Sequence, residues 1–305
     1  MIGVRLEMFG LVFTGPKTII HNITKCVEKA GLSVAETVIT SLALTESILS
    51  DGEKDFGTIV IDMGGGQTTT AVMHDKQLKF THVDQEGGEF VTKDISIVLN
   101  TSFNNAEALK INYGDAYPSR TSADEDFPVD VIGKTDPVKV DERYLAEIIE
   151  ARLEQIFRKA KDALDEIEAL DLPGGVVLTG GAASLPGVVD LAEDIFGTTV
   201  KLHVPNQMGL RNPVFTNVIS IVNYSAELSD VYHLAKSAVT GEKVSLSASP
   251  QTNAVSTAPV YDDYEASNDY EEETKPKNEE KVTGKIKDFF SNIFCLLYTS
   301  DAADE

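Results

Sequence analysis

The sequence predicts an α/β protein, and three features point to that class. Residues 58–72 indicate two β-strands joined by a glycine turn, because β-branched residues run into Asp62 and three glycines follow it. Residues 176–196 indicate an apolar strand, a second glycine turn and a helix. Residues 141–170 carry apolar side chains at a 3.6-residue period, which predicts one long amphipathic helix.

Composition narrows the class of function. A chain of 305 residues is long enough for two domains. Its net charge of −23, with no basic stripe, argues against nucleic acid as a partner. Cys26 and Cys295 lie far apart, which favours a reducing cytoplasm and indicates no metal site. There is no apolar run of about 18 residues, so we expect no membrane-spanning helix.

The remaining elements follow from the same patterns. Cys26 falls on the apolar stripe of the first expected helix, which predicts a core position. Residues 51–54 predict a solvated turn, and Asp75-Lys76 predicts a hairpin turn. The last expected helix is predicted to be mostly buried. We expect helices over 18–30, 42–49, 88–99, 104–113, 188–196 and 217–234. We expect strands over 1–13 (one strand, or two joined at Gly10), 32–39, 78–83, 129–133 and 200–204.

The two glycine turns are candidate phosphate sites. Backbone N–H groups of Gly64, Gly65 and Gly66 suit phosphate oxygens, and the carboxylate of Asp62 beside them suits a hydrated divalent metal. Gly180-Gly181 follow a strand and precede a helix, an arrangement that accepts nucleotide phosphate or ribose. The alternatives are a glycine-rich hairpin that binds nothing and an ordinary strand-to-helix turn.

The C-terminal part has a different composition. Residues 236–281 are polar and acidic, and cannot bury enough apolar surface to order themselves, so we expect a flexible linker. Periodicity returns at 282–295, where apolar side chains share one face and lysines flank them. This pattern favours a helix at the membrane interface; the alternative is a helix that docks on the body or on a partner. The expected membrane-binding residues are Ile286, Phe289, Phe290, Ile293 and Phe294.

Four motifs together resemble the actin-like ATPases, and within them the FtsA family of bacterial cell division proteins. They are Asp62–Thr69, Gln85–Gly88 with 91–95, Ala106–Lys110 with Tyr113-Gly114, and Pro173–Gly187. The linker and the Phe-rich helix resemble the ending of the same family. The resemblance implies an actin-like ATPase (ribonuclease H-like) fold with the second large domain nearly complete and the first mostly missing.

The resemblance also implies a division into parts. Residues 1–32 resemble the end of a small self-association subdomain, and 33–56 the returning end of the first large subdomain. Residues 57–85 and 171–235 resemble the second large actin-like subdomain, with 86–170 inserted as the adenosine and FtsZ side. The acidic linker (236–281) and the membrane helix (282–295) follow, and residues 296–305 are expected to be a foreign tail.

Ligand residues are implied position by position. Asp62 resembles the carboxylate that acts on Mg²⁺ through water, and Glu107 and Lys110 the pair that holds adenosine. The resemblance implies that Arg152, Arg158 and Lys159, with Lys161, receive the C-terminal peptide of FtsZ; the alternative is a helix face that is only solvated. The implied ATP-binding residues are Asp62, Gly64, Gly65, Gly66, Gln67, Thr68, Gly87, Gly88, Glu107, Lys110, Gly180, Gly181 and Ala182.

Departures from the family pattern lower the expected activity. The first phosphate loop is absent from this chain, so we expect weak ATP binding by this polypeptide alone. Gln67 and Thr69 stand where many relatives have Thr and Asp. Losing that second carboxylate removes one anchor for the metal and the attacking water, so we expect slow or negligible hydrolysis.

The resemblance implies a protein that tethers the FtsZ ring to the cytoplasmic membrane at the division septum. Its expected partners are FtsZ, further copies of itself, anionic lipids and other division-ring proteins. Two alternatives are an ATP-hydrolysing enzyme of the same superfamily, either a sugar kinase or a chaperone-type ATPase, and a pilus-assembly relative. The absence of an evident substrate base weighs against the enzyme, and the terminal helix weighs against both.

Overall fold

The computed structural model describes residues 12–228 and 232. By its contacts the chain separates into two units, 1–246 and 247–305, and the second lies outside the described residues. Nearly all of the strand expected over 1–13 lies outside them too, as do the acidic linker, the Phe-rich helix and the tail. The proposed division of the first unit into subdomains stays a prediction.

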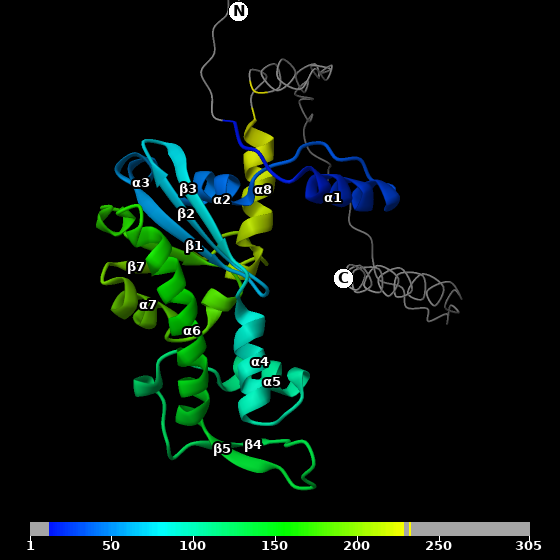
Figure 1. Cartoon of the computed structure of the whole chain (residues 1–305), viewed down its shortest axis with the longest axis vertical. Coiled ribbons are helices and arrows are strands. Elements are labelled where there is room, and N and C mark those ends of the chain that lie inside the picture. Colours follow the sequence, from blue (N-terminus) through cyan, green and yellow to red (C-terminus); the bar gives the residue numbers. More distant parts are fainter. Residues whose placement is uncertain (1–11, 229–231, 233–305) are drawn as a thin grey trace, which may run out of the picture. The chain divides into compact units, whose positions relative to one another are not determined.

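A five-stranded sheet with the order β3-β2-β1-β6-β7 is the centre of the first unit (Figure 1). β1 (Thr58–Met63), β2 (Thr68–His74) and β3 (Gln77–Asp84) form an antiparallel meander. β6 (Val176–Thr179) pairs parallel to β1, and β7 (Val200–Leu202) parallel to β6. Asp75 and Lys76 both have positive φ, as the tight β2–β3 turn requires, which confirms the predicted hairpin.

Alternation along β1 assigns its side chains to two separate cores. Ile59, Ile61 and Met63 join the large core with α6 (Glu142–Asp165) and α7 (Val188–Phe196). Val60 faces the other way and packs with Leu44 of α2 (Thr40–Ile48). Because side chains of a strand alternate, Asp62 belongs to the α2 side of the sheet.

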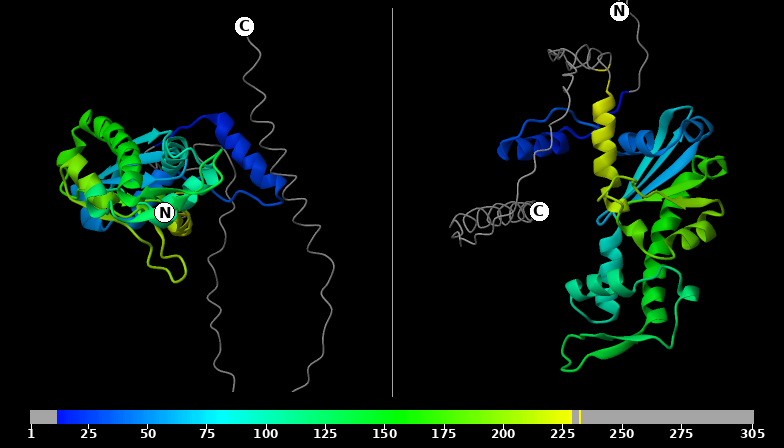
Figure 2. Two further views of the ribbon diagram at one scale, coloured as in Figure 1. Left: turned by 90° about the horizontal axis from the view of Figure 1, so that it is seen from below. Right: turned by 180° about the vertical axis from the view of Figure 1, so that it is seen from behind.

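α6 is the longest helix in the described part of the chain, and its buried positions confirm the predicted period. It packs against α4 (Gly88–Val98) and α7, and α4 packs against α5 (Phe103–Tyr113). β4 (Asp126–Val129) and β5 (Val138–Asp141) form a separate antiparallel pair. Figures 1 and 2 show α4, α5 and this pair grouped around one end of α6, with the large sheet against its other end.

α8 (Thr216–Glu227) packs against α2, on the face of the sheet away from α6. α1 (Lys17–Lys29) and α3 (Asp51–Phe56) are the other α-helices in the described residues. Short 3₁₀ turns lie at Pro118–Arg120, Ala169–Asp171, Ala182–Ser184 and Pro213–Phe215. None of the helices in the described part has both the length and the apolar character needed to cross a bilayer.

Several expectations were wrong. Residues 51–54 lie in α3, which begins with a capping box between Ser50 and Glu53. Cys26 is exposed, and α1 buries none of its residues. Residues 32–39 form no strand, and the strand expected over 129–133 is β4, which ends at Val129.

Other elements were predicted with the wrong extent or burial. The long helix ends at Asp165, where a turn replaces the expected continuation to residue 170. The strand expected over 200–204 ends at Leu202. α8 is not mostly buried, because Val218 and Val222 are 63% and 61% exposed.

Truncating Leu153 in α6 should destabilise the first unit. Leu153 is fully buried in the large core, so Leu153→Ala should lower the free energy of unfolding by about 2–5 kcal/mol. Ile111→Ala on α5, where the side chain is 69% exposed, should cost less than about 1 kcal/mol. Urea unfolding of both variants measures the difference, and equal losses would contradict the packing of α6.

Candidate functional site

Gly64, Gly65 and Gly66 form the turn between β1 and β2, at the carboxyl end of β1. The Gly64 amide donates to the Gln67 carbonyl at 2.9 Å, which closes the turn. Two carbonyl oxygens of the turn accept hydrogen bonds from the first residues of α4. The Gly88 amide donates to Gly64 O at 2.9 Å, and the Glu89 amide donates to Gly65 O at 2.8 Å. The first glycine turn is therefore fixed against the N-terminus of α4, while Gly65 and Gly66 stay exposed.

Gly88 lies where the first glycine turn, the second glycine turn and α5 meet. A β-carbon at Gly88 would lie 3.2 Å from the Ala182 β-carbon, 3.7 Å from Gly64 O and 3.7 Å from Lys110 Nζ. At Gly87 a β-carbon would lie 2.5 Å from the carbonyl oxygens of both Gly64 and Gly65. Glycine is required there because the two backbones approach more closely than any side chain allows.

Glu107 and Lys110 pair on one face of α5, as predicted. Lys110 Nζ donates to Glu107 Oε2 at 2.7 Å, to Thr92 Oγ1 at 2.7 Å and to Gly88 O at 3.1 Å. The Thr92 hydroxyl donates to the same Glu107 oxygen and also contacts Gly88 O. Burial alone would raise the pKa of Glu107, but the hydrogen bonds from Lys110 and Thr92 outweigh it and hold that pKa below its usual value.

The pKa of Asp62 is shifted in the opposite direction to that of Glu107. Asp62 is 9% exposed, and burial raises its pKa despite a hydrogen bond from Asn217 Nδ2 to Asp62 Oδ2 at 2.6 Å. Its other oxygen, Oδ1, is buried without a hydrogen-bond partner among the described residues. Ionising Asp62 therefore costs free energy that a nearby cation would offset.

The second glycine turn closes over Asp62. Gly180 has φ +93°, and a β-carbon there would lie 2.5 Å from Asp62 Oδ1 and 2.5 Å from Met63 O. Gly181 lies beside Val214, and Ala182 begins the 3₁₀ turn that reaches Gly88. Residues 180–182 and 62–66, which are far apart in sequence, therefore form one continuous backbone cradle.

The other predicted site residues are placed less favourably for a ligand. Gln67 is exposed at the tip of the turn. Thr68 is buried, and its hydroxyl donates to Glu86 O at 2.8 Å, so this residue anchors the loop before α4. The sequence reasoning missed Thr92 and Asn217 as site residues. Thr92 lies one turn into α4 and Asn217 lies at the start of α8, and both residue types are common at such positions. The sequence therefore gave no indication that either side chain belongs to the site.

The cations of α6 that were expected to bind a partner peptide are engaged within the chain. Arg152 forms a bidentate ion pair with Asp94 of α4, with an Nε–Oδ2 distance of 2.5 Å and an Nη2–Oδ1 distance of 3.0 Å. It also donates to Glu86. Lys159 pairs with Glu86 at 2.6 Å. Arg158 pairs with Glu154 of its own helix and Lys161 donates to Ile195 O. A peptide would have to displace these contacts.

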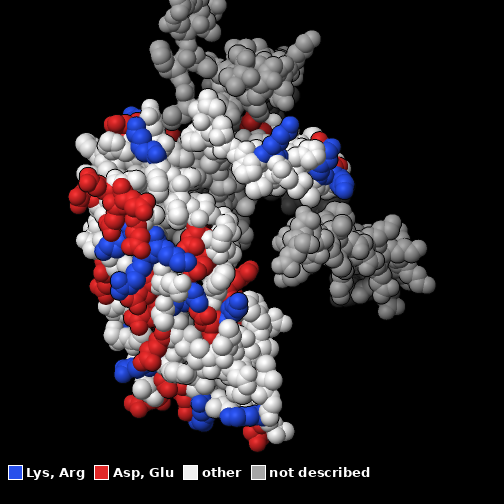
Figure 3. Space-filling model, viewed as in Figure 1, with Lys and Arg blue, Asp and Glu red and all other residues white. Residues whose placement is uncertain are grey.

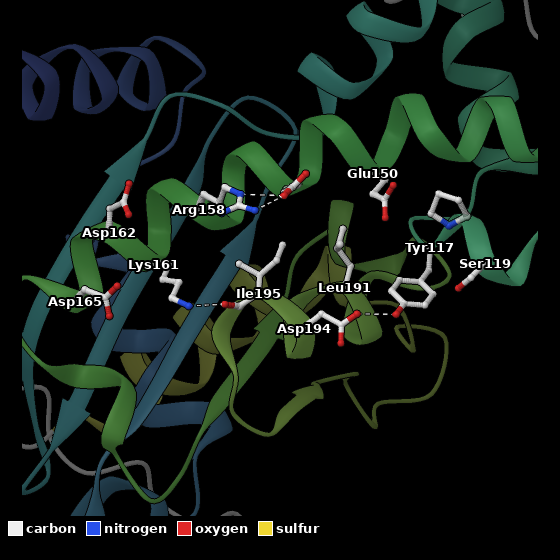
Figure 4. Close-up of a pocket in the computed structure, with 12 residues that line it drawn as sticks. Tyr117, Ser119, Glu150, Arg158, Lys161, Asp162, Asp165, Leu191, Asp194 and Ile195 are labelled. Atoms are coloured by element: carbon white, nitrogen blue, oxygen red, sulfur yellow. Dashed lines mark hydrogen bonds and ion pairs between the residues drawn. The ribbon is translucent and has the colours of Figure 1, made fainter.

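A groove of about 930 Å³ lies between α6 and α7 (Figure 4). Its lining includes five carboxylates, and no residue of either glycine turn contributes to it. Figure 4 shows Tyr117 and Asp194 hydrogen-bonded across one end of it. Phosphate oxygens would meet like charges there, so the groove does not suit a nucleotide. The five carboxylates are Glu150, Glu154, Asp162, Asp165 and Asp194.

Figure 3 shows acidic and basic side chains interspersed over the side where α6 and α7 lie. No basic patch dominates that face. Within the described residues, no group of three or more His, Cys, Asp and Glu side chains could hold a metal ion directly. The unpartnered Oδ1 of Asp62 fits a single contact to a hydrated cation.

Adding a methyl group at Gly180 should disturb the cradle. Gly180→Ala forces a positive φ on alanine and places its β-carbon against Asp62. Gly197→Ala is the matched control, since Gly197 has φ +70° but nothing within 4 Å of its β-carbon position. We expect Gly180→Ala to lower the free energy of unfolding by about 1–3 kcal/mol more than the control does in urea unfolding. Equal losses would contradict the close approach.

The Lys110–Glu107 pair should make stability depend on pH. Because the folded-state pKa of Glu107 is lowered, its contribution is present above the unfolded carboxyl range and is lost as pH falls through the folded pKa. The stability advantage of the natural chain over Lys110→Met should therefore shrink between pH 7 and about pH 3. Lys139→Met removes an exposed ion pair to Asp126 and should show little difference at any pH. If the difference in stability between the natural chain and Lys110→Met did not change with pH, that result would argue against an ion pair between Lys110 and Glu107.

Comparisons with known proteins agree on one family. The family described as "Cell division protein FtsA" matches residues 59–220, and "Cell division protein FtsA, C-terminal" matches residues 231–294. The chain is 74% identical over 296 residues to the cell division protein FtsA of Enterococcus faecalis, covering 96% of this chain and 67% of that protein. It is 43% identical over 225 residues to FtsA of Bacillus subtilis, covering 74% of this chain and 51% of that protein.

Solved structures agree on the fold. MreB5 of Spiroplasma citri bound to ADP gives a TM-score of 0.56 at 14% identity, covering 74% of this chain and 69% of that one. A chain of the PilM–PilN type IV pilus biogenesis complex gives 0.54 at 16% identity, covering 68% and 58%. These likenesses establish the actin-like ATPase fold predicted from the glycine motifs. Because the family match and the high identity to curated relatives agree, the chain belongs to the FtsA family of cell division proteins.

Proposed function

We propose that the chain tethers FtsZ filaments to the cytoplasmic face of the membrane at the division septum, with ATP and Mg²⁺ as structural ligands. The observation that carries the proposal is the joint family match, which includes residues 231–294 and with them the Phe-rich helix. An actin-like body followed by such a helix has two separate binding functions. The body binds nucleotide and protein partners, and the helix binds lipid.

The glycine cradle is the part of the body assigned to ATP. Gly64, Gly65 and Gly66 would face the β- and γ-phosphates, and residues 180–182 the α-phosphate and sugar. Glu107 and Lys110 would hold the adenosine. Mg²⁺ would neutralise charge on the phosphate oxygens, and Asp62 would contact it through water. The unpartnered Asp62 oxygen and the backbone approaches at Gly88 and Gly180 support this assignment.

The terminal helix is assigned to anionic lipid. Phe289, Phe290, Ile293 and Phe294 share one face in the sequence pattern, and each buried side chain contributes about 1.5–3 kcal/mol. That is enough for reversible binding by one helix. Self-association of the body would present many helices at once and strengthen attachment. These residues lie outside the described part of the chain, so the assignment rests on sequence and family.

The C-terminal peptide of FtsZ is assigned to the subdomain of residues 86–170. Other division-ring proteins are expected partners at the septum, with no site assigned to them. Arg152 and Lys159 are held by carboxylates of neighbouring elements, so they are poor candidates for primary contacts. Arg158 is 66% exposed at its side chain and pairs only within α6 among the described residues. Of these three cations it has the ion pair that an acidic peptide would displace most easily, but it lines the carboxylate-rich groove, so such a peptide would have to approach it from outside that groove.

Reconstitution on vesicles tests the tether. The natural chain should bring labelled FtsZ to sedimenting vesicles that contain anionic lipid, whereas Phe289→Asp/Phe290→Asp should lose at least about tenfold of its vesicle binding. Ser291→Asp/Asn292→Asp adds the same charge on the polar face and should bind nearly normally. FtsZ without its C-terminal peptide should stay in the supernatant. Equal sedimentation of the two double variants would reject the membrane helix.

A further inference from the structure

The N-terminus of α8 is attached to the sheet at two neighbouring strand ends. Asp62 of β1 and Thr179 of β6 are direct partners in the parallel register. Asn217 Nδ2 donates to Asp62 Oδ2 at 2.6 Å, and Thr179 Oγ1 donates to Thr216 Oγ1 at 2.8 Å. Two consecutive residues of α8 thus hold two adjacent strands, but only the first contact involves a carboxylate.

The Asn217 contact has a feature that an ordinary anchor lacks. Asp62 is more than nine-tenths buried, and its second oxygen, Oδ1, has no hydrogen-bond partner among the described residues. Asn217 Oδ1 is also buried and unpartnered there. Buried polar atoms are normally satisfied, so one unpartnered oxygen on each of two side chains that share a hydrogen bond through their other polar atoms indicates missing donors. Water molecules of a hydrated cation are donors of that kind.

We propose that Asn217 is a positioning residue for Asp62. Its amide nitrogen holds Oδ2 and so fixes the orientation of the carboxylate. With a hydrated cation bound, Asp62 Oδ1 and the Asn217 amide oxygen would accept hydrogen bonds from its water shell. The amide oxygen would thereby partly replace the second carboxylate that Gln67 and Thr69 do not supply. This inference rests on the proposed binding of Mg²⁺ and ATP. It adds a residue from α8, which packs on the face of the sheet opposite to α6 and α7.

The experiment compares ATP affinity in Mg²⁺ with ATP affinity in EDTA, by calorimetric titration of the whole chain. In the natural chain Mg²⁺ should tighten ATP binding. Asn217→Ala should reduce that Mg²⁺ effect about tenfold or more, while affinity in EDTA stays nearly unchanged. Asn217→Leu, which keeps similar bulk and has a higher helix propensity, should behave the same and covers the case in which the alanine variant unfolds.

Thr216→Val is the matched control, because it breaks the neighbouring anchor of α8 without touching Asp62. If Asn217 served only to hold α8, the Thr216 and Asn217 variants would change the Mg²⁺ effect equally, and that result would overturn the inference. The side-chain amide signals of Asn217 in nitrogen-15 spectra should also shift in Asp62→Ala; unchanged signals would likewise overturn it. A natural chain with no Mg²⁺ effect would instead reject the proposed nucleotide site, and the role of Asn217 with it.

Discussion

The close approach of three backbone segments at the carboxyl end of β1 is the constraint on which the site depends. The turn after β1, the start of α4 and the turn after β6 meet where Gly64, Gly88 and Gly180 lack side chains. A β-carbon at Gly87 or Gly180 would lie 2.5 Å from carbonyl or carboxylate oxygens. Since no L side chain fits there, these glycines allow the three backbone segments to come together.

The pKa values of two carboxylates in this region are shifted in opposite directions: that of Glu107 is lowered and that of Asp62 is raised. This difference indicates different roles for the two side chains. Glu107 accepts hydrogen bonds from Lys110 and Thr92, which lower its pKa against the effect of burial. Its charge is already compensated in the protein. Burial raises the pKa of Asp62, and the single amide of Asn217 compensates only in part. A nearby cation would therefore stabilise the charge of Asp62 more than that of Glu107, because the Asp62 charge is only partly compensated within the protein.

The sequence predicted the parts of the fold that local pattern determines. The β2–β3 hairpin, α6 and both glycine turns follow from periodicity and from residues with special backbone freedom. α3 carried a signal that was missed, because Ser50 and Glu53 have the spacing of a capping box. The exposure of α1 and of Val218 on α8 could not be predicted, because an apolar stripe does not say which surface covers it.

The site was predictable only where one residue type is obligatory. Glycines that permit close approach, and a carboxylate after a strand, can be recognised from sequence. Asn217 could not, because its contact joins residues 155 positions apart and depends on how α8 meets the sheet. The α6 cations show the reverse error. In the sequence they form a basic cluster that could bind a partner. In the structure Arg152 forms an ion pair with Asp94, and Lys159 forms one with Glu86.

If the chain binds nucleotide as proposed, the register of β1 and β2 favours holding the nucleotide over cleaving it. Thr69 is the direct cross-strand partner of Asp62, so its side chain lies on the same face of the sheet. A carboxylate at 69 would add a second anchor for a hydrated cation, but at this position it would also stand beside a buried, poorly compensated charge. The neutral threonine avoids that repulsion and leaves a single carboxylate. A cation with one such anchor can screen phosphate, whereas orienting an attacking water requires a further fixed group.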